Sequence, residues 1–351
     1  MNKKIVFISN YFGNGGAANV IKTLAQNFSE KQGYDVTIVA MQDDEKKYTV
    51  PSNVKFICID NNFKFKPIKK IFRILKLRKI LKKEKCSIIS FEYFINMQTI
   101  LANFGLKNKL VIYERNDQAR VGHKKRKARN FLYKFADSLV CQTPDAKNYF
   151  PENIQKISTI IPNPINDNLP EPWNGERKKE IVNYCRLEKQ KNLPMLVDAF
   201  EIVHEKYPDY TLSIYGDGNE ENSLKDYIKV KRLEKYIKIH PAVKNIHEKV
   251  LKSKMFVSSS NYEGLSNSMI ESMAIGLPTI CTDCPCGGAK MMIKHGENGL
   301  LVPVGDCKEL SNTIIKLIEN DKLYEKISNN GKKIREKLDS QKICSEWQNL
   351  I

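Results

Sequence analysis

The sequence lacks any long apolar run. A membrane-crossing helix needs about 20 consecutive apolar residues, and no stretch of the 351-residue sequence comes near that length. The basic start of the chain is followed by an apolar stretch far too short for a secretory leader, and we interpret residues 4–9 as a first β-strand. These absences predict a cytoplasmic protein. At this length we expect two domains, each with its own core.

Regular cysteine spacing is also lacking. The nine cysteines are odd in number and mostly irregular in spacing, which is typical of reduced core thiols rather than of a disulfide framework. Cys281, Cys284 and Cys286 could form half of a metal site, but only His295 is a nearby candidate for a further ligand. An ordinary turn after a strand explains the cluster better, so we expect no metal site.

Acidic residues are scarce in the first half of the chain only. Residues 1–165 carry 30 Lys and Arg against 13 Asp and Glu, a balance of +17, whereas residues 166–351 carry 28 against 27, a balance of +1. This asymmetry indicates that the first half alone meets an anionic surface.

The densest basic segment, residues 64–85, has eleven Lys and Arg and one Glu. It predicts a helix over 67–85 with two apolar faces, one starting at Ile68 and Ile71 and the other containing Ile74 and Leu77. One face would cover the sheet, and the other, ringed by lysines, suits an anionic lipid surface. A sheet-covering helix with a solvated lysine side remains the alternative. Residues 123–135 add a second basic patch.

Strand and helix patterns alternate along the whole chain, which predicts an α/β fold with parallel sheets. The expected strands lie at 4–9, 35–41, 54–60, 87–91, 109–113, 138–141, 180–184, 211–215, 237–240, 254–258 and 279–281. Residues 161–179, with four prolines, are interpreted as a linker. We therefore expect two tandem Rossmann-like, doubly wound domains, 1–165 and 166–335, facing across a cleft. Residues 336–351 form a helix expected to cross back to the first domain.

A glycine-rich turn follows the first expected strand. Gly15 and Gly16 would let backbone N–H groups approach an anion at a helix N-terminus. The string from Gly13 to Ala18 also fits the dinucleotide fingerprint, which leaves an NAD-dependent oxidoreductase open. Residues 10–12 intervene before Gly13, however, so the loop is longer than that fingerprint requires. A turn without a ligand remains a further alternative.

The second half carries paired cations and paired carboxylates. Arg186 and Lys191 follow an expected strand and could clamp a diphosphate. Glu263 and Glu271 stand eight residues apart, one before a helix start and one inside the helix. Because Glu271 lies in a segment that looks buried all round, an unpaired carboxylate there would be costly, which favours a ligand.

Four short motifs follow one another along the second half of the chain. They are Cys185-Arg186-Leu187-x3-Lys191-Asn192, Tyr215-Gly216-Asp217-Gly218, Glu263-x7-Glu271 and Gly296-Glu297-Asn298-Gly299. In this order and spacing the chain closely resembles a retaining, nucleotide-sugar-dependent glycosyltransferase of family 4, with the GT-B two-domain fold. The resemblance covers nearly the whole chain and is strongest over 181–310.

The resemblance implies roles for these residues. Glu271 would accept hydrogen bonds from the two ribose hydroxyls, because a carboxylate matches a vicinal diol, and Glu263 would face the donor sugar. Arg186, Lys191 and the Gly15–Gly16 loop would stabilise the leaving diphosphate. The turn amides that would assist them belong to Leu265, Ser266, Asn267 and Ser268. Since no Asp-x-Asp occurs in the sequence, cations would replace a divalent metal, no cofactor is expected, and front-face attack by the acceptor would retain configuration.

Two departures from the family bear on the acceptor side. Many members have a histidine where this chain has Tyr113-Glu114-Arg115-Asn116-Asp117, so Arg115 or Asn116 would take its role. A similar string occurs in members that use UDP-hexoses or UDP-N-acetylhexosamines in bacterial surface-glycan assembly. The second departure is Lys290, in a segment where many members have Pro-Glu. We expect a glycan or lipid-linked acceptor, met on the inner face of the plasma membrane.

A basic nucleic-acid-binding protein is the non-enzyme alternative. Its basic residues would be interleaved with stacking aromatics, but here they are mixed with aliphatic residues. We therefore expect no nucleic-acid partner.

Overall fold

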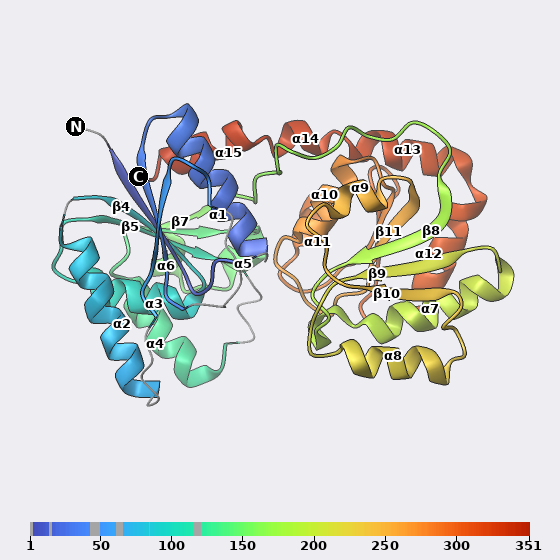
Figure 1. The fold of residues 1–351 in the computed structure, drawn as a ribbon, viewed down its shortest axis with the longest axis horizontal. Helices are drawn as coiled ribbons and strands as arrows, with labels where there is room; N and C mark the ends of the chain where they lie inside the picture. Colours follow the sequence, from blue (N-terminus) through green and yellow to red (C-terminus); the bar gives the residue numbers. More distant parts are fainter. Residues whose placement is uncertain (1–2, 14–15, 43–49, 61–65, 84, 116–120) are drawn as a thin grey trace. The chain divides into compact units, whose positions relative to one another are not determined.

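The computed structural model describes residues 3–13, 16–42, 50–60, 66–83, 85–115 and 121–351. The chain forms two compact units, Met1–Asp167 with Leu338–Ile351 (unit 1), and Asn168–Lys337 (unit 2). Each unit holds one sheet covered by helices (Figure 1). All paired strands are parallel, so the α/β class expected from the sequence is confirmed.

Unit 1 contains a seven-stranded sheet of order β3-β2-β1-β4-β5-β6-β7. Its strands are β1 Lys4–Ser9, β2 Asp35–Ala40, β3 Val54–Cys58, β4 Ser87–Phe91, β5 Lys109–Glu114, β6 Ser138–Cys141 and β7 Ser158–Ile160. The central strands read as continuous apolar runs because both faces of a parallel sheet are covered; Ile5, Phe7 and Ile8 of β1 are fully buried. The sequence reading missed β7, which has only three residues.

The helices of unit 1 are α1 Gly16–Gln26, continued by a π-helical turn at Asn27–Lys31, α2 Lys66–Leu81, α3 Tyr93–Asn103, α4 His123–Tyr133, α5 Pro144–Asn148, α6 Glu152–Gln155 and α15 Ser340–Gln348. The two-faced character expected for α2 is confirmed, because Leu77 and Leu81 are buried whereas Ile71 and Leu75 are each 60% exposed. The helix ends at Leu81, four residues earlier than expected.

The C-terminal segment of the chain belongs to unit 1. Trp347 of α15 is buried and stacks on Phe91 with 6.5 Å between ring centroids. Its ring also meets Tyr113 edge-on at 5.2 Å. The side-chain amide of Asn27 donates to the Ser340 hydroxyl at 3.3 Å. These aromatic and polar contacts fix α15 on this unit.

Unit 2 contains a six-stranded sheet of order β10-β9-β8-β11-β12-β13. Its strands are β8 Lys178–Tyr184, β9 Thr211–Tyr215, β10 Ile237–His240, β11 Ser253–Ser258, β12 Thr279–Thr282 and β13 Leu300–Val302. Its helices are α7 Leu193–Lys206, α8 Glu221–Val230, α9 Ile246–Val250, α10 Asn267–Ala274, α11 Gly288–Met292, α12 Cys307–Glu319, α13 Asp321–Gly331 and α14 Ile334–Lys337, with a 3₁₀ turn at Lys189–Lys191.

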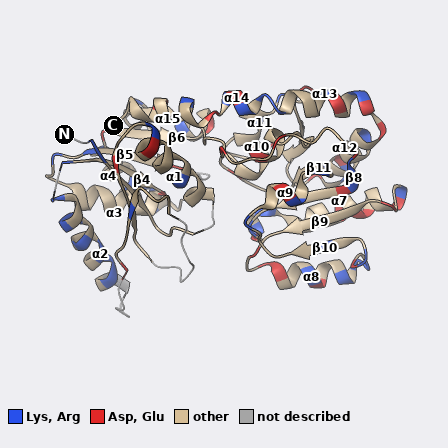
Figure 2. Ribbon diagram, turned by 45° about the horizontal axis from the view of Figure 1, so that its top comes forward, with Lys and Arg blue, Asp and Glu red and all other residues tan. Residues whose placement is uncertain are grey.

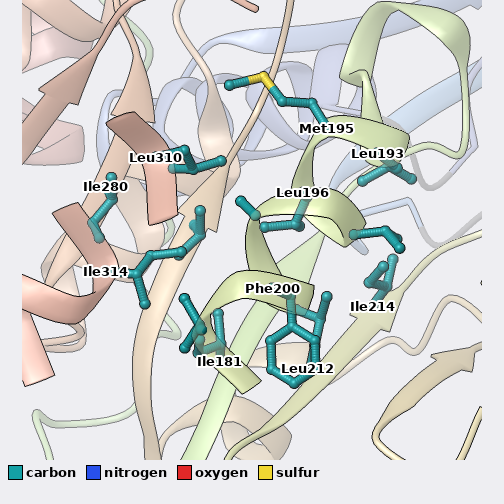
Figure 3. Packing of buried hydrophobic residues seen from close by; sticks show 14 of the residues in the cluster. Ile181, Leu193, Met195, Leu196, Phe200, Leu212, Ile214, Ile280, Leu310 and Ile314 are labelled. Carbon is teal, nitrogen blue, oxygen red and sulfur yellow. The ribbon is translucent and has the colours of Figure 1, made fainter. Parts of the chain in front are cut away.

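Side chains from α7 and α12 form the core on one face of this sheet (Figure 3). Leu196 and Phe200 of α7 pack with Ile181 and Leu212 of the sheet, and all are fully buried. A side-chain cap fixes the start of α12, where Asp306 accepts from the backbone N–H of Glu309. Such caps satisfy N–H groups that have no partner within the helix.

Within the described part of the chain, every helix falls short of the length or apolarity required to span a bilayer.

Candidate functional site

The motifs of the second half converge on one edge of the unit 2 sheet. In the sheet order β9-β8-β11-β12, the chain leaves β8 toward β9 on one side and leaves β11 toward β12 on the other. The connections after β8 and β11 therefore run in opposite directions. The carboxyl ends of two such strands form the switch point at which doubly wound sheets bind ligands. The segment after β8 contains Arg186 and Lys191, and the segment after β11 contains Glu263.

Backbone contacts hold the loop after β8 in place. The N–H of Leu187 donates to the Asp217 carbonyl at 2.9 Å, and the N–H of Cys185 donates to the Tyr215 carbonyl at 3.0 Å. A Cβ at Gly216 would lie 1.8 Å from the Cys185 carbonyl oxygen, and one at Gly218 would lie 2.2 Å from that of Leu187. Glycine is therefore required at both positions of the Gly-Asp-Gly string.

Lys191 and Glu263 form an ion pair at the centre of this edge. The Lys191 Nζ lies 2.5 Å from the Glu263 Oε2, and the two side chains are 11% and 22% exposed. Burial lowers the pKa of Lys191, but the Glu263 carboxylate outweighs it, so the net pKa shift is upward and the amine stays protonated. The site thus holds a fixed ammonium group beside a carboxylate in a poorly solvated place.

Neighbouring polar groups orient this pair. The Gln190 side-chain amide donates to Glu263 Oε2 at 3.2 Å and to the Tyr262 carbonyl at 2.9 Å. The Ser260 hydroxyl lies 3.4 Å from the same carboxylate oxygen. The backbone N–H of Asn261 donates to the Gln190 carbonyl at 2.9 Å. The loops after β8 and β11 are therefore tied together, and Glu263 keeps one orientation.

Glu271 lies inside α10 and is 9% exposed. His247, from the short helix α9, places its Nε2 3.0 Å from Glu271 Oε2. The expectation that this carboxylate would be unpaired without a ligand is therefore wrong, because burial is offset by a histidine partner. Among the described residues, His247 is the only side chain that forms a hydrogen bond or ion pair with the Glu271 carboxylate.

Tyr184, the last residue of β8, supports this second pair. Its hydroxyl donates to the Ser268 carbonyl at 2.9 Å and lies 2.8 Å from the Ser272 hydroxyl. Its ring meets the His247 ring edge-on at 5.9 Å. Burial, and secondarily the charge of Glu271, raises the Tyr184 pKa well above its ordinary value. Tyr184 is therefore a neutral hydrogen-bond donor that anchors α10 to the sheet.

The turn before α10 is built by close backbone packing. Leu265 is buried, whereas Ser266, Asn267 and Ser268 are partly exposed. The Ser266 side chain caps the helix by accepting from the Met269 N–H. A Cβ at Gly288 would lie 1.9 Å from the Gly264 carbonyl oxygen, so the start of α11 is pressed against this turn. Because α10 follows β11 along the chain, its N-terminal end lies at the same carboxyl edge of the sheet as Glu263.

Arg186 and the nearby thiols complete the site. Arg186 is exposed, and it forms no ion pair with any residue that the structure describes. Burial raises the pKa of Cys185 and of Cys284 to about 12, and raises that of Cys281 further. All three thiols are therefore protonated at neutral pH. Within the described ranges no cluster of three His, Cys, Asp or Glu has metal-binding geometry.

The residues expected to act from the first half lie in unit 1. Gly16 is the first residue of α1, and Arg115 directly follows β5, with its guanidinium 5.7 Å from the Tyr113 ring centroid. Gly15 and Asn116 lie outside the described residues. Because β1 ends at Ser9, residues 10–15 separate strand and helix, which is the longer loop that counts against a dinucleotide fingerprint.

Sequence reasoning missed His247, Gln190 and Tyr184. His247 lies 24 residues before its partner in a five-residue helix, so no local pattern reveals it. Tyr184 directly precedes the Cys185–Asn192 motif and Gln190 lies inside it, so their polar side chains after an expected strand were a usable signal.

Two family models match the chain, one in each half. The model described as "Glycosyltransferase Family 4" matches residues 14–169, and the one described as "Glycosyl transferases group 1" matches residues 166–334. Together they span both units.

Bacterial glycosyltransferases match over the full length. An α-1,4-N-acetyl-D-galactosaminyltransferase of Campylobacter jejuni, which acts on an undecaprenol-linked GalNAc-GalNAc-diNAcBac acceptor, is 27% identical over 99% of this chain and 98% of its own. The amylovoran biosynthesis glycosyltransferase AmsD of Erwinia amylovora is 24% identical over 100% of both chains.

Solved structures show the same fold. The Anabaena protein HepE in complex with UDP-glucose superposes with a TM-score of 0.85 at 18% identity, over 99% of this chain and 100% of that one. With its two parallel sheets, its two family matches and its full-length relatives, the chain belongs to the family 4-like glycosyltransferases with the GT-B fold.

Proposed function

We propose that the protein is a retaining, metal-independent glycosyltransferase. It would transfer a hexose or N-acetylhexosamine from a UDP-sugar to a hydroxyl of a glycan or lipid-linked acceptor in bacterial surface-glycan synthesis. The single observation that carries the proposal is the Lys191–Glu263 pair at the switch point of unit 2. The fixed Lys191 ammonium lies at this switch point, which is where doubly wound folds bind nucleotide phosphates.

The bond that breaks in this reaction releases a nucleoside diphosphate, so negative charge grows on the leaving phosphate. Lys191 is protonated and held in place, and Arg186 is exposed near the start of the same loop. Preorganised cations aimed at developing charge stabilise a transition state without reorganisation. These two side chains would therefore supply the charge for which other transferases use a divalent metal.

Glu271 would bind the ribose of the nucleotide. Its carboxylate can accept hydrogen bonds from two adjacent hydroxyls. The contact with His247 engages Oε2 and thereby fixes the rotation of the carboxylate. A charged acceptor whose position is already set binds a diol with less loss of side-chain entropy.

The environment of Glu263 supports retention by front-face attack. Its Oε2 receives the Lys191 ammonium and the Gln190 amide. A carboxylate that is stabilised by a cation and a hydrogen bond is a poor nucleophile, because those contacts would be lost on forming a covalent sugar ester. The acceptor hydroxyl would instead attack the face that the diphosphate leaves.

The acceptor assignment rests on relatives and on charge. A relative in C. jejuni acts on an undecaprenol-linked glycan and one in E. amylovora takes part in amylovoran synthesis. The first half of this chain carries a balance of +17, which suits an acceptor presented at an anionic membrane surface. The enzyme would therefore work on the inner face of the plasma membrane.

A thermal-shift panel tests the donor. UDP, GDP, ADP and their sugars would be added separately to the full-length protein, with NADH as a rival ligand. A ligand that binds only the folded state raises the melting temperature by mass action. We expect UDP and UDP-sugars to give the largest rise in melting temperature. In a separate assay by NMR, the sugar released or transferred from the UDP-sugar should keep its anomeric configuration. A shift with NADH alone would overturn the proposal.

A further inference from the structure

Exposed apolar side chains concentrate on one set of helices in unit 1. Of the twelve large hydrophobic side chains that are exposed in the described part of the chain, eight lie between residues 68 and 135. They are Ile68, Ile71, Leu75, Phe94, Leu101, Phe104, Phe131 and Phe135. All eight are on α2, α3 or α4 or within two residues of their ends, and we call this surface the α2–α4 face.

Side-chain contacts join the three helices into one surface. At one end, the Lys70 Nζ lies 4.9 Å from the Phe94 ring centroid. Farther along, the Arg78 guanidinium donates to the Phe104 carbonyl at 2.6 Å. The Phe104 and Phe135 rings are 5.8 Å apart, and Phe135 is 5.7 Å from Phe131. These contacts link α2 to α3 and bring the aromatic ends of α3 and α4 side by side, so the exposed apolar residues lie on adjoining helices.

This apolar surface is embedded in positive charge. Helices α2 and α4 together contain twelve Lys and Arg and no Asp or Glu, and α3 has no charged residue. Figure 2, with Lys and Arg in blue, shows basic residues along α2. Asp60 pairs with Lys69 and with the buried Arg73, which leaves Lys70 and Lys79 exposed beside Ile71 and Leu75.

A basic hollow adjoins the aromatic end of this face. A depression of about 670 Å³ is lined by Lys3, Lys4, Lys85, Lys107 and Lys109. It shares Leu106, Asn108 and Asp137 with a smaller depression beside Phe104 and Phe135. Several lysine side chains thus lie next to exposed aromatic rings.

We propose that the α2–α4 face docks on an anionic lipid bilayer, with its aromatic and aliphatic side chains entering the interfacial layer and its lysines contacting headgroup phosphates. Apolar insertion flanked by Lys and Arg is the pattern of interfacial membrane binding. Two copies of this chain docked through this face would bring their exposed lysines, among them Lys70 and Lys79, into apposition, so like charge disfavours self-association. The inference deepens the proposed function, because a lipid-linked acceptor would be met at this surface.

The charge arrangement also decides how binding responds to salt. Exposed charge–charge attraction is screened beyond about 10 Å at 0.1 M salt, whereas burial of apolar side chains is not weakened by salt. Binding that depends on lysines alone would be lost at high salt. Binding by the α2–α4 face would fall with salt but keep a residual apolar component.

Vesicle flotation of the full-length protein tests the proposal, with vesicles of phosphatidylcholine alone or mixed with phosphatidylglycerol. The apolar variant carries Ile71→Ser, Leu75→Ser, Phe104→Ser and Phe131→Ser. The matched control carries Ile202→Ser, Val230→Ser and Val304→Ser, which are exposed apolar residues of unit 2. We expect binding to the anionic vesicles, a loss of at least tenfold in the apolar variant and no loss in the control.

A basic variant separates the two components. It carries Lys70→Gln, Lys76→Gln, Lys79→Gln and Lys82→Gln; Arg73 is left unchanged because it is buried and paired. Its control replaces four exposed lysines of unit 2, Lys229, Lys235, Lys308 and Lys322. We expect the basic variant to lose binding to anionic vesicles at low salt, and its control to retain it.

A fluorescence measurement locates the inserted residues. A Phe131→Trp variant should be quenched by brominated lipids well beyond the quenching of the parent, whose two tryptophans are Trp173 and Trp347. Full vesicle binding by the apolar variant, equal binding of the parent to neutral vesicles, or no binding at all would overturn the proposal. Dimers that dissociate in the apolar variant would do the same and identify a second copy as the occupant. Each variant's melting shift with UDP is measured in parallel, so a failure of docking is distinguishable from a failure of the donor site.

Discussion

Replacing Glu263 with alanine should destabilise unit 2 and at the same time favour nucleotide binding. The substitution leaves the Lys191 ammonium, 11% exposed, without its carboxylate. Breaking a buried pair by removing one partner costs about 3–5 kcal/mol, and an exposed pair contributes about 0–1 kcal/mol. Because this pair is mostly but not fully buried, we expect a loss of about 2–3 kcal/mol, or about 4–12 °C in melting temperature for a domain of this size.

UDP should reverse part of that loss. Its diphosphate would give Lys191 a new anionic partner, so UDP should stabilise Glu263→Ala more than the parent, while uridine, which lacks the diphosphate, should not. Turnover should fall in the same variant. Differential scanning fluorimetry and titration calorimetry at neutral pH measure both effects.

Two further variants serve as controls for the pair. Glu263→Gln keeps a hydrogen-bond acceptor without charge and should fall between Glu263→Ala and the parent. Lys191→Met combined with Glu263→Ala removes both charges and should recover most of the stability, because no unpaired ion remains. The reasoning is refuted if Glu263→Ala melts like the parent, or if uridine protects it as well as UDP does.

Three other predictions follow from the same site. Glu271→Ala should weaken UDP binding by about 1.5–3 kcal/mol, the usual contribution of a charged hydrogen-bond acceptor, as measured by calorimetry. Glu180→Ala is a control, because Glu180 accepts from Ser213 and Ser253 at the amino end of its strand. Equal losses of UDP binding in both variants would reject the assignment. His247→Ala should raise the UDP dissociation constant about threefold to tenfold, as expected for one orienting hydrogen bond, and an unchanged constant would show that Glu271 needs no support. EDTA should leave transfer activity intact, since Lys191 and Arg186 supply the charge; activity lost with EDTA and restored by Mg²⁺ or Mn²⁺ would contradict this.

Most of the sheet framework was predictable from the sequence, because buried parallel strands read as apolar runs. The expected strand at 4–9 matches β1 Lys4–Ser9, and that at 211–215 matches β9 Thr211–Tyr215. The three-residue strands β7 and β13 were missed, since three residues cannot show a pattern. Helix α3 was also missed; it buries Asn96, Thr99 and Asn103 and therefore lacks a clean apolar stripe.

The site was predictable as motifs but not as contacts. The resemblance implied that Lys191 stabilises the diphosphate and that Glu263 faces the donor sugar, but only the structure shows that these two side chains form a direct ion pair. It suggested that Glu271 is buried, which is correct, but the partner His247 depends on how α9 packs over β8. The glycines at 216 and 218 were assigned to a motif, whereas their physical reason is the contact with the loop after β8. Which side chains pair across a sheet edge depends on the order of the strands, and local sequence patterns do not encode that order.

The central claim is that the carboxyl edge of the unit 2 sheet, at the β8–β11 switch point, binds the nucleotide of the donor. Hydrogen–deuterium exchange of the full-length protein with and without saturating UDP tests it most directly, because it reports which backbone amides the ligand protects. We expect protection in peptides covering 185–192 and 260–272, and unchanged exchange at the opposite edge around 176–180 and 208–211. Protection at that opposite edge, or none at the switch point while UDP is bound, would contradict the account.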